Sequence, residues 1–386
     1  MIAGDGRLGF LSGSEEESAL DYVRRLGRLR WRRRFPGRRA VELDGGRPAS
    51  ETFAAGEDWL VVRDEIAIPL PGGDLAPVAG HVVVAAPRSP ADPPFVHTLA
   101  ELERERVPPA EDRDAQTGDP PAIGFSVSDF PPAEGETVRD YVRRLLSPRS
   151  PRRFPAQFAA VVFIPEQVAG TDPSGVCAGE RPEVVRHFPN HIRRLLDVGC
   201  GTGEASAGLR LASPGVSIIG IERHAASAER ARARVDRVLT GDAADALRRL
   251  AEEGARFDAF LFADVLEHLE DPTGALTLAR ELALPEATLV ASVPNVGHLS
   301  LVRDLVAGRF DPLPAGLADA GHLRWFTRAS LEEALEEAGW RTVEITALPG
   351  APAPEAEQFL GRAAAFPEFD RDALAAYQWV AVARAE

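Results

Sequence analysis

The second half of this chain is predicted to adopt an α/β fold, a doubly wound sheet with helices on both faces. From residue 182 onward, short apolar runs of strand length alternate with amphipathic helical patterns. The first run, Leu195–Val198, leads into glycines at alternate positions, Gly199, Gly201 and Gly203. Such a run is typical of a tight turn between a buried strand and a helix, where a ligand approaches bare backbone.

The composition of the chain argues against several classes of function. The chain has 386 residues, enough for two domains, and 45% of them are hydrophobic. A net charge of -15 argues against a nucleic-acid partner. Met1–Phe10 does not read as a secretion signal, and no apolar run approaches the ~18 residues of a membrane span. The two cysteines, Cys177 and Cys200, make no disulfide framework, so we predict a cytoplasmic protein.

The composition changes near residue 182, which predicts two parts. Residues 1–181 form an accessory α+β region whose fold the sequence leaves open, and residues 182–386 form one domain. Residues 85–122 are rich in proline and acidic side chains, as in a linker or extended surface loop. This region is also predicted to contain a short helix, Leu99–Arg106, and two strand-like patches. The first patch is Trp59–Val62 with Ile66–Ile68, the second is His81–Ala85, and Pro71–Asp74 forms a turn between them.

The first part also contains an internal repeat. Asp21–Leu26 recurs as Asp140–Leu145, and Arg33–Pro36 recurs as Arg152–Pro155 at the same offset. Two matches in register indicate a duplicated helix-plus-turn unit, with tyrosine, valine and leucine on one helix face and arginines on the other. Three interpretations stay open: a solvated amphipathic helix, an arginine cluster that binds an anionic acceptor, and a contact between two copies of the chain.

The elements of the second part follow from the apolar runs and their boundaries. The predicted helices are Glu183–Arg194, Glu204–Leu211, Ala225–Arg234 and Leu331–Gly339. The predicted strands are Leu195–Val198, Val216–Ile221, Arg237–Leu239, Phe257–Phe262, Thr288–Val293, Thr342–Ala347 and Gln378–Ala383.

Four segments resemble a known family. Leu195–Glu204 is similar to motif I of class I S-adenosylmethionine-dependent methyltransferases, since Glu204 replaces the last glycine of the dinucleotide fingerprint. Ala263–Pro272 resembles a segment of a large methyltransferase subgroup that includes enzymes of ubiquinone, glycan and natural-product pathways. His298–Leu305 and Gly321–Thr327 resemble methyltransferases of polysaccharide and antibiotic clusters. The resemblance implies a Rossmann-like seven-stranded methyltransferase sheet and S-adenosylmethionine as cofactor.

The resemblance also implies the residues that bind this cofactor. The loop glycines admit the methionine part, and Asp242 accepts a hydrogen bond from the adenine amine. Glu222 lies about 20 residues beyond the loop, where such folds place the carboxylate that binds the ribose. The full predicted set is Asp197, Gly199, Cys200, Gly201, Gly203, Glu222, Arg223, Asp242, Ala243, Ala263 and Asp264.

For catalysis, the sulfonium is already activated, so the protein mainly aligns the reactants and, for a hydroxyl acceptor, supplies a base. Histidine is the natural base near neutral pH, and the candidates are His268, His298 and His322. His268 ranks first because it follows the fourth strand directly. The predicted enzyme O-methylates a hydroxyl of a small-molecule natural product or sugar. Its expected partners are a small-molecule or glycan acceptor and a second copy of the chain, with no nucleic acid and no membrane.

Two alternatives remain. Asp264, Glu267, His268 and His322 resemble the metal site of small-RNA terminal 2′-O-methyltransferases, although an aspartate replaces the first glutamate. Such a set would hold a divalent ion that binds vicinal hydroxyls and lowers their pKa. The other alternative is a non-catalytic sensor or scaffold that binds the same cofactor.

Overall fold

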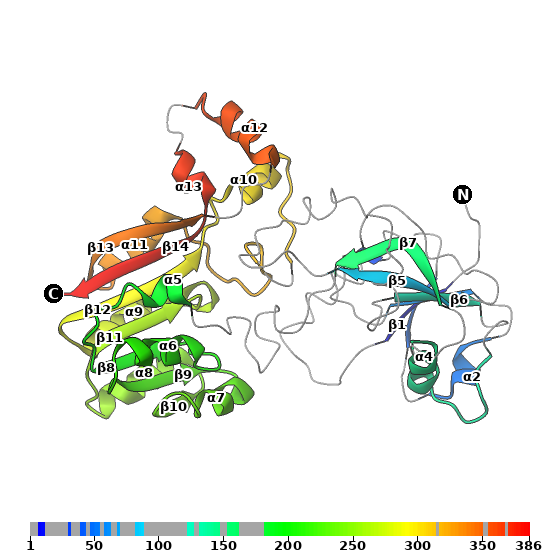
Figure 1. Cartoon of the computed structure of the whole chain (residues 1–386), viewed down its shortest axis with the longest axis horizontal. Coiled ribbons are helices and arrows are strands. Elements are labelled where there is room, and N and C mark those ends of the chain that lie inside the picture. Colours follow the sequence, from blue (N-terminus) through cyan, green and yellow to red (C-terminus); the bar gives the residue numbers. More distant parts are fainter. Residues whose placement is uncertain are drawn as a thin grey trace. The chain divides into compact units, whose positions relative to one another are not determined.

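The computed structural model describes the chain in separate ranges: 7–11, 30–31, 39–43, 47–54, 58–62, 68–69, 82–88, 122–126, 131–146, 153–161, 181–313, 316–349, 354–366 and 370–386. The chain divides into two compact units (Figure 1). Unit 1 comprises Met1–Ala91 and Leu99–Ile164, and unit 2 comprises Asp92–Thr98 and Pro165–Glu386. The predicted boundary at residue 182 stays a prediction.

Unit 2 contains a seven-stranded sheet in the order β10-β9-β8-β11-β12-β14-β13. Every pairing is parallel except those of β14, which runs antiparallel to both neighbours. The strands are β8 (Arg194–Val198), β9 (Ser217–Glu222), β10 (Arg237–Thr240), β11 (Phe257–Ala263), β12 (Ala283–Pro294), β13 (Trp340–Pro349) and β14 (Ala376–Ala385).

The order of these strands positions a ligand site. The chain runs from β8 outward through β9 and β10, then returns to the other side of β8 as β11 and continues outward to β12. The point between β8 and β11 is therefore a topological switch point, where the connections leave in opposite directions. In open α/β sheets, ligands bind outside the carboxyl ends of the strands at such a point.

Helices cover both faces of this sheet. The core on one face takes side chains from α8 (Ala243–Glu252), α9 (Pro272–Glu281) and α11 (Arg328–Glu337). The core on the other face takes them from α5 (Pro182–Val185), α6 (Glu204–Ala212) and α7 (Ala225–Ala231). The remaining helices are η2 (Leu266–His268), α10 (Leu299–Val306), α12 (Pro354–Ala363) and α13 (Arg371–Ala375). The predicted seven-stranded, doubly covered α/β fold is confirmed.

One predicted helix of unit 2 is wrong. A helix was expected over Glu183–Arg194, but α5 ends at Val185 and Arg194 already belongs to β8. Pro189 explains the difference, because proline has no backbone N–H and its ring clashes with the preceding turn of a helix. Strand β12 also begins earlier than expected, since Ala283 pairs with Phe257 ahead of a register shift.

Unit 1 contains a second mixed sheet, in the order β2-β1-β3-β6-β5-β7-β4. Its strands and helices are β1 (Arg7–Leu11), β2 (Arg39–Leu43), α2 (Ala49–Thr52), β3 (Asp58–Val62), β4 (Ile68–Pro69), β5 (Val82–Arg88), β6 (Ala122–Ser126), α4 (Val138–Leu146) and β7 (Arg153–Val161). Strands β5 and β6 include both ends of the predicted linker 85–122. The predicted helix Leu99–Arg106 and turn Pro71–Asp74 lie outside the described residues. Within the ranges that the structure describes, no helix has the length and apolar character needed to cross a membrane.

The helix of the second repeat copy forms as the sequence predicts, whereas Arg153–Pro155, which was expected to form a turn, belongs to strand β7. In α4, Tyr141, Val142 and Leu145 are buried, and the Tyr141 ring packs on Phe53 with 4.8 Å between ring centroids. Arg144 lies on the exposed side and forms an ion pair with Glu136 at 2.9 Å. The guanidinium lowers the pKa of Glu136 below its usual range. The first copy, Asp21–Leu26 with Arg33–Pro36, lies outside the described residues.

Candidate functional site

The glycine loop follows β8 and is anchored to the neighbouring strand. The backbone N–H groups of Gly199 and Cys200 both donate to the carbonyl of Ile221, at 2.8 and 3.0 Å. The loop glycines all have positive φ, which side chains rarely tolerate. Gly203 is the N-cap of α6, so the loop ends at the amino terminus of a helix, where N–H groups point toward a ligand.

Two of these glycines are needed for different reasons. At Gly199, φ is 74° and an added Cβ would lie 2.7 Å from Cγ2 of Val265, a contact too short for two carbons. At Gly201, φ is 53° but an added Cβ would meet nothing within 4 Å. Gly199 therefore allows close packing against the segment after β11, whereas Gly201 borders open space.

Asp197 lies inside the protein at the end of β8. Only 2% of it is exposed, and its Oδ2 accepts a hydrogen bond of 2.5 Å from the Ser206 hydroxyl in α6. Burial raises the pKa of Asp197 to about 7, although the hydrogen bond from Ser206 acts in the opposite direction. Cys200, on the loop, is a free cysteine whose sulfur is buried beside Gly220, and burial raises the pKa of its thiol.

Glu222 ends β9 and holds the loop from the side. Its Oε2 accepts from the N–H of Gly201 at 2.9 Å, and its Oε1 accepts from the N–H of His224 at 2.7 Å. The residue is buried, whereas the next one, Arg223, is exposed. Each carboxylate oxygen has a second lone pair, so Glu222 can also accept hydrogen bonds from two hydroxyls of a ligand.

Asp242 follows β10 and caps α8. Its Oδ1 accepts from the N–H groups of Ala244 and Asp245, at 2.8 and 3.3 Å. Ala243 is the first residue of the helix. An aspartate in this position is a standard N-cap, which satisfies donors that have no partner inside the helix. The cap accounts for one of its two oxygens.

Asp264 directly follows Ala263, the last residue of β11, and has a φ of 53°. Its carboxylate accepts from the Ser292 hydroxyl at 2.8 Å, from the Gln378 amide and from the guanidinium of Arg181, with which it forms an ion pair. Positive φ in an aspartate is uncommon, and these partners fix it. Sequence reasoning missed Arg181 and Gln378, since neither belongs to a motif.

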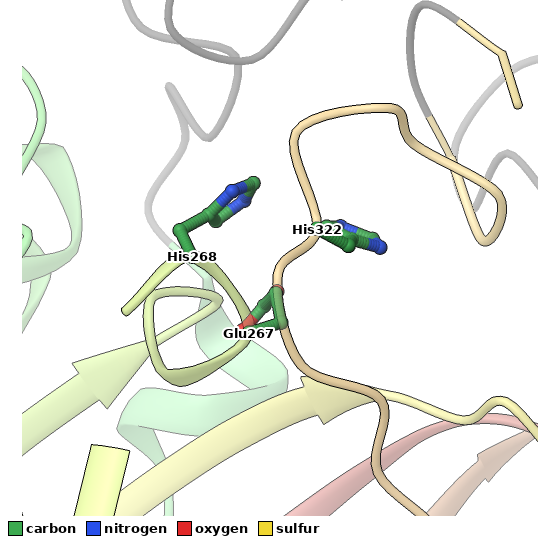
Figure 2. Close-up of side chains that lie close together, drawn as sticks. All are labelled: Glu267, His268 and His322. Atoms are coloured by element: carbon green, nitrogen blue, oxygen red, sulfur yellow. The ribbon is translucent and has the colours of Figure 1, made fainter. Parts of the chain in front are cut away.

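Glu267, His268 and His322 form a cluster beyond the carboxyl end of β11 (Figure 2). One nitrogen or oxygen of each lies within 4.8 Å of those of the other two. Glu267 and His268 belong to η2, and His322 belongs to the loop before α11. The carbonyl of Glu267 ties the two segments together, because it accepts from the N–H groups of Leu323 and Arg324 at 2.8 and 3.0 Å.

The cluster is buried and has unpartnered polar atoms. Only 1% of Glu267 is exposed, and its Oε2 has no hydrogen-bond partner. Burial and the nearby Asp264 raise the pKa of Glu267 well above its usual range. Burial lowers the pKa of His268 and brings that of His322 to about 3, so both rings are neutral near pH 7. Nδ1 of His322 also lacks a partner.

Two further buried polar groups follow β12 in the chain. Asp319 was missed by sequence reasoning. It is buried, its Oδ1 accepts from the N–H of Gly321 at 2.6 Å, and burial raises its pKa to about 7. His298, a predicted catalytic residue, is buried at the N-cap of α10, where Nδ1 accepts from the N–H of Ser300 at 3.3 Å. Burial lowers the pKa of His298 to about 4.

The structure therefore brings together two of the three predicted catalytic histidines and three of the four residues of the alternative metal set. Asp264 is the member whose carboxylate is bound elsewhere, by Arg181, Ser292 and Gln378. Beyond β12, a groove of about 720 Å³ is lined by residues of α10 to α13, of β14 and of the loops between them, among them Val302, Val306, Phe359, Phe366 and Trp379.

This chain is similar to a known protein family and to several curated proteins. A family model described as "Methyltransferase domain" matches residues 136–345. A "Ubiquinone biosynthesis O-methyltransferase" of Cereibacter sphaeroides is 32% identical over 155 residues, which are 39% of this chain and 61% of that protein. One of Azorhizobium caulinodans with the same name is 28% identical over 183 residues, 44% of this chain and 70% of that protein. The chain thus spans about six tenths of the length of the first of these relatives.

Among solved structures, a "SAM dependent methyltransferase from Archaeoglobus fulgidus" aligns with a TM-score of 0.39 and 20% identity. The alignment covers 53% of this chain and 91% of that one.

Proposed function

This chain belongs to the methyltransferase-domain family, and from that membership we propose that it transfers a methyl group from S-adenosylmethionine to a hydroxyl oxygen of a small molecule. The observation that carries the proposal is the position of Glu222. Its carboxylate ends the strand beside the glycine loop and accepts from the loop's own Gly201 N–H. A carboxylate there suits the two hydroxyls of a ribose.

The other cofactor contacts follow from the same placement. Gly201 leaves open space in which the methionine part can approach the backbone, and the second oxygen of Asp242 serves the adenine amine. Asp264, fixed by Arg181, borders the sulfonium end of the cofactor at the switch point between β8 and β11. The remaining contacts of the predicted set, including Asp197, Cys200, Arg223, Ala243 and Ala263, stay predictions.

The acceptor is proposed to be a small molecule with a hydroxyl group and an apolar part. The relatives above are named for O-methylation in ubiquinone biosynthesis. The groove beyond β12 has a volume in the range of small-molecule pockets and a mainly apolar lining. His268 and His322 are neutral imidazoles, so each has a lone pair for the acceptor hydroxyl or for a group that acidifies it.

The test measures binding and turnover separately. Isothermal titration with S-adenosylhomocysteine is expected to give one saturable site per chain. Incubation with methyl-labelled S-adenosylmethionine and a panel of hydroxylated metabolites is expected to label at least one acceptor on oxygen. Cofactor binding without transfer to any acceptor would favour the sensor or scaffold alternative, and absence of cofactor binding would refute both. A cytoplasmic location, a glycan acceptor and a homo-oligomer remain predictions.

A further inference from the structure

We propose that Glu267, His268 and His322 bind one divalent transition-metal ion of the Zn²⁺ and Co²⁺ class, with an open position for the acceptor oxygen. The second part of this proposal rests on the proposed function, whereas the ion site itself does not. Two imidazole nitrogens and one carboxylate oxygen form a known zinc ligand set, and catalytic zinc sites keep a fourth position open.

The unpartnered atoms of the cluster point to a missing ligand. Glu267 is 1% exposed, yet its Oε2 has no partner, and Nδ1 of His322 is also buried without one. A buried polar atom without a hydrogen bond destabilises the protein, because the hydrogen bonds that it made to water in the unfolded chain are not replaced. Among the described residues, these two atoms belong to side chains that already lie within 4.8 Å of each other and of His268. One ion would satisfy both.

The outer contacts of the histidines fit the same ion. Nδ1 of His268 lies 3.2 Å from the carbonyl oxygen of Gly321, so its N–H can donate there and leave the lone pair on Nε2. The His322 ring forms a hydrogen bond with the backbone of Leu317, and since Nδ1 has no partner, Nε2 makes this bond. Metal-binding histidines commonly donate their second ring N–H to a carbonyl or carboxylate, which fixes tautomer and orientation.

The two segments that supply the ligands are held together without an ion. The Glu267 carbonyl accepts from two N–H groups of the loop that carries His322. Ligand atoms around one Zn²⁺ lie about 3.4 Å apart when each bond is about 2.1 Å. The ligand atoms now lie up to 4.8 Å apart, so side-chain rotations that move them by about 1 Å would bring them to this spacing. Asp264 takes no part, because Arg181, Ser292 and Gln378 occupy its carboxylate.

The ion would change how the acceptor loses its proton. Binding to the ion would lower the pKa of the hydroxyl group, and its proton would pass to bulk water. The oxygen then forms a bond to the methyl carbon while the carbon–sulfur bond breaks. The electron pair of that bond returns to sulfur, and S-adenosylhomocysteine leaves as a neutral thioether. An acceptor with a second oxygen beside the reacting hydroxyl would chelate the ion, so vicinal diols and catechols are the favoured class.

The experiment begins with the full chain, stripped with a chelator and dialysed. Titration with Co²⁺, followed by visible absorption, is expected to reach saturation at one ion per chain with the strong bands of a low-coordinate site. Isothermal titration with Zn²⁺ should give the same stoichiometry. His322→Gln and Glu267→Gln are expected to weaken Zn²⁺ binding at least tenfold, whereas His191→Gln, which changes an exposed histidine, should leave it unchanged.

Two readouts separate the ion site from the proposed function. Affinity for S-adenosylhomocysteine should stay within about twofold in His322→Gln, which also shows that this variant is folded. Absence of saturable Co²⁺ binding, or equal Zn²⁺ affinity in the parent and both cluster variants, would overturn the ion site and leave methyl transfer standing. Binding of one ion by a chain that methylates no diol or catechol would overturn the acceptor class and leave the ion site standing.

Discussion

Glu222 has two partners that belong to the protein and, in our proposal, two that belong to the cofactor. Its oxygens accept from the N–H groups of Gly201 and His224, so the carboxylate shapes the loop before any ligand arrives. Its contribution to binding is therefore both direct and through the position of the glycine loop. Substitution at this residue tests the cofactor half of the function most directly.

Glu222→Ala is expected to weaken binding of S-adenosylhomocysteine at least tenfold, as measured by isothermal titration. The loss of charged hydrogen bonds to two ribose hydroxyls is worth about 1–3 kcal/mol, and about 1.4 kcal/mol corresponds to tenfold. Glu229→Ala is the matched control, because Glu229 is an exposed glutamate of α7, the helix that follows β9. Equal affinity in the two variants would mean that the ribose lies elsewhere.

Asp197 makes the stability of unit 2 depend on pH. Its pKa is about 7 in the folded protein, against an ordinary value of 3.8. Between these values the folded state keeps a proton that the unfolded state releases. The free energy of unfolding therefore falls as pH rises from about 4 to about 7, by up to about 1.4 kcal/mol per pH unit.

Asp197→Asn removes this titration but keeps an oxygen that accepts from Ser206. We expect the variant to lose less stability than the parent protein between pH 5 and pH 7. Urea unfolding at pH 5, 6 and 7, followed by tryptophan fluorescence, measures the difference. Asp245→Asn, at an exposed position of α8, should retain the parent's slope. An unchanged slope in Asp197→Asn would show that this carboxyl is ionised throughout the range.

At the scale of elements, the glycine loop and the segment after β11 fit together through one contact. Val265 lies between Asp264 and η2, and its methyl group occupies the space that a side chain at position 199 would need. The loop and the cluster of Glu267, His268 and His322 are thus joined by packing. A change on one side is expected to reach the other.

Gly199→Ala is expected to destabilise the protein by about 1–3 kcal/mol, because of its positive φ and the overlap with Val265. The double variant Gly199→Ala with Val265→Ala should recover part of this loss, as measured by urea unfolding in a double-mutant cycle. Gly201→Ala has positive φ but no steric neighbour, so its loss of stability should be smaller while its loss of cofactor affinity remains. Strict additivity in the cycle would exclude the proposed contact.

At the scale of the whole molecule, the features predicted correctly from the sequence are those that a short segment determines. The strand, loop and helix around Gly199, and the strand that leads to Glu222, each depend on neighbouring residues. The partners of Asp264 could not be predicted, because Arg181 and Gln378 lie 83 and 114 residues away in sequence. Asp319 gave no motif signal, and its burial depends on how its loop folds.

The contact between Arg181 and Asp264 also bears on how the chain can be divided. A fragment that begins at Pro165 keeps the longer segment of unit 2, Pro165–Glu386. A fragment that begins at Pro182 lacks Arg181 as well. We expect the longer fragment to bind S-adenosylhomocysteine within about threefold of the full chain. Acceptor use or oligomeric state should change in both fragments, because both lack the repeated arginine helix. Light scattering and the labelled-methyl assay measure these properties.

The shorter fragment should be less stable than the longer one by about 1–3 kcal/mol, since Asp264 loses its charged partner inside a half-buried site. Arg181→Ala in the longer fragment is the control that isolates this pair from the loss of residues 165–180. It should reproduce most of the difference in thermal melts followed by circular dichroism. If Arg181→Ala melts like its parent while the shorter fragment does not, the stabilising contacts come from residues 165–180, and Asp264 does not depend on this guanidinium.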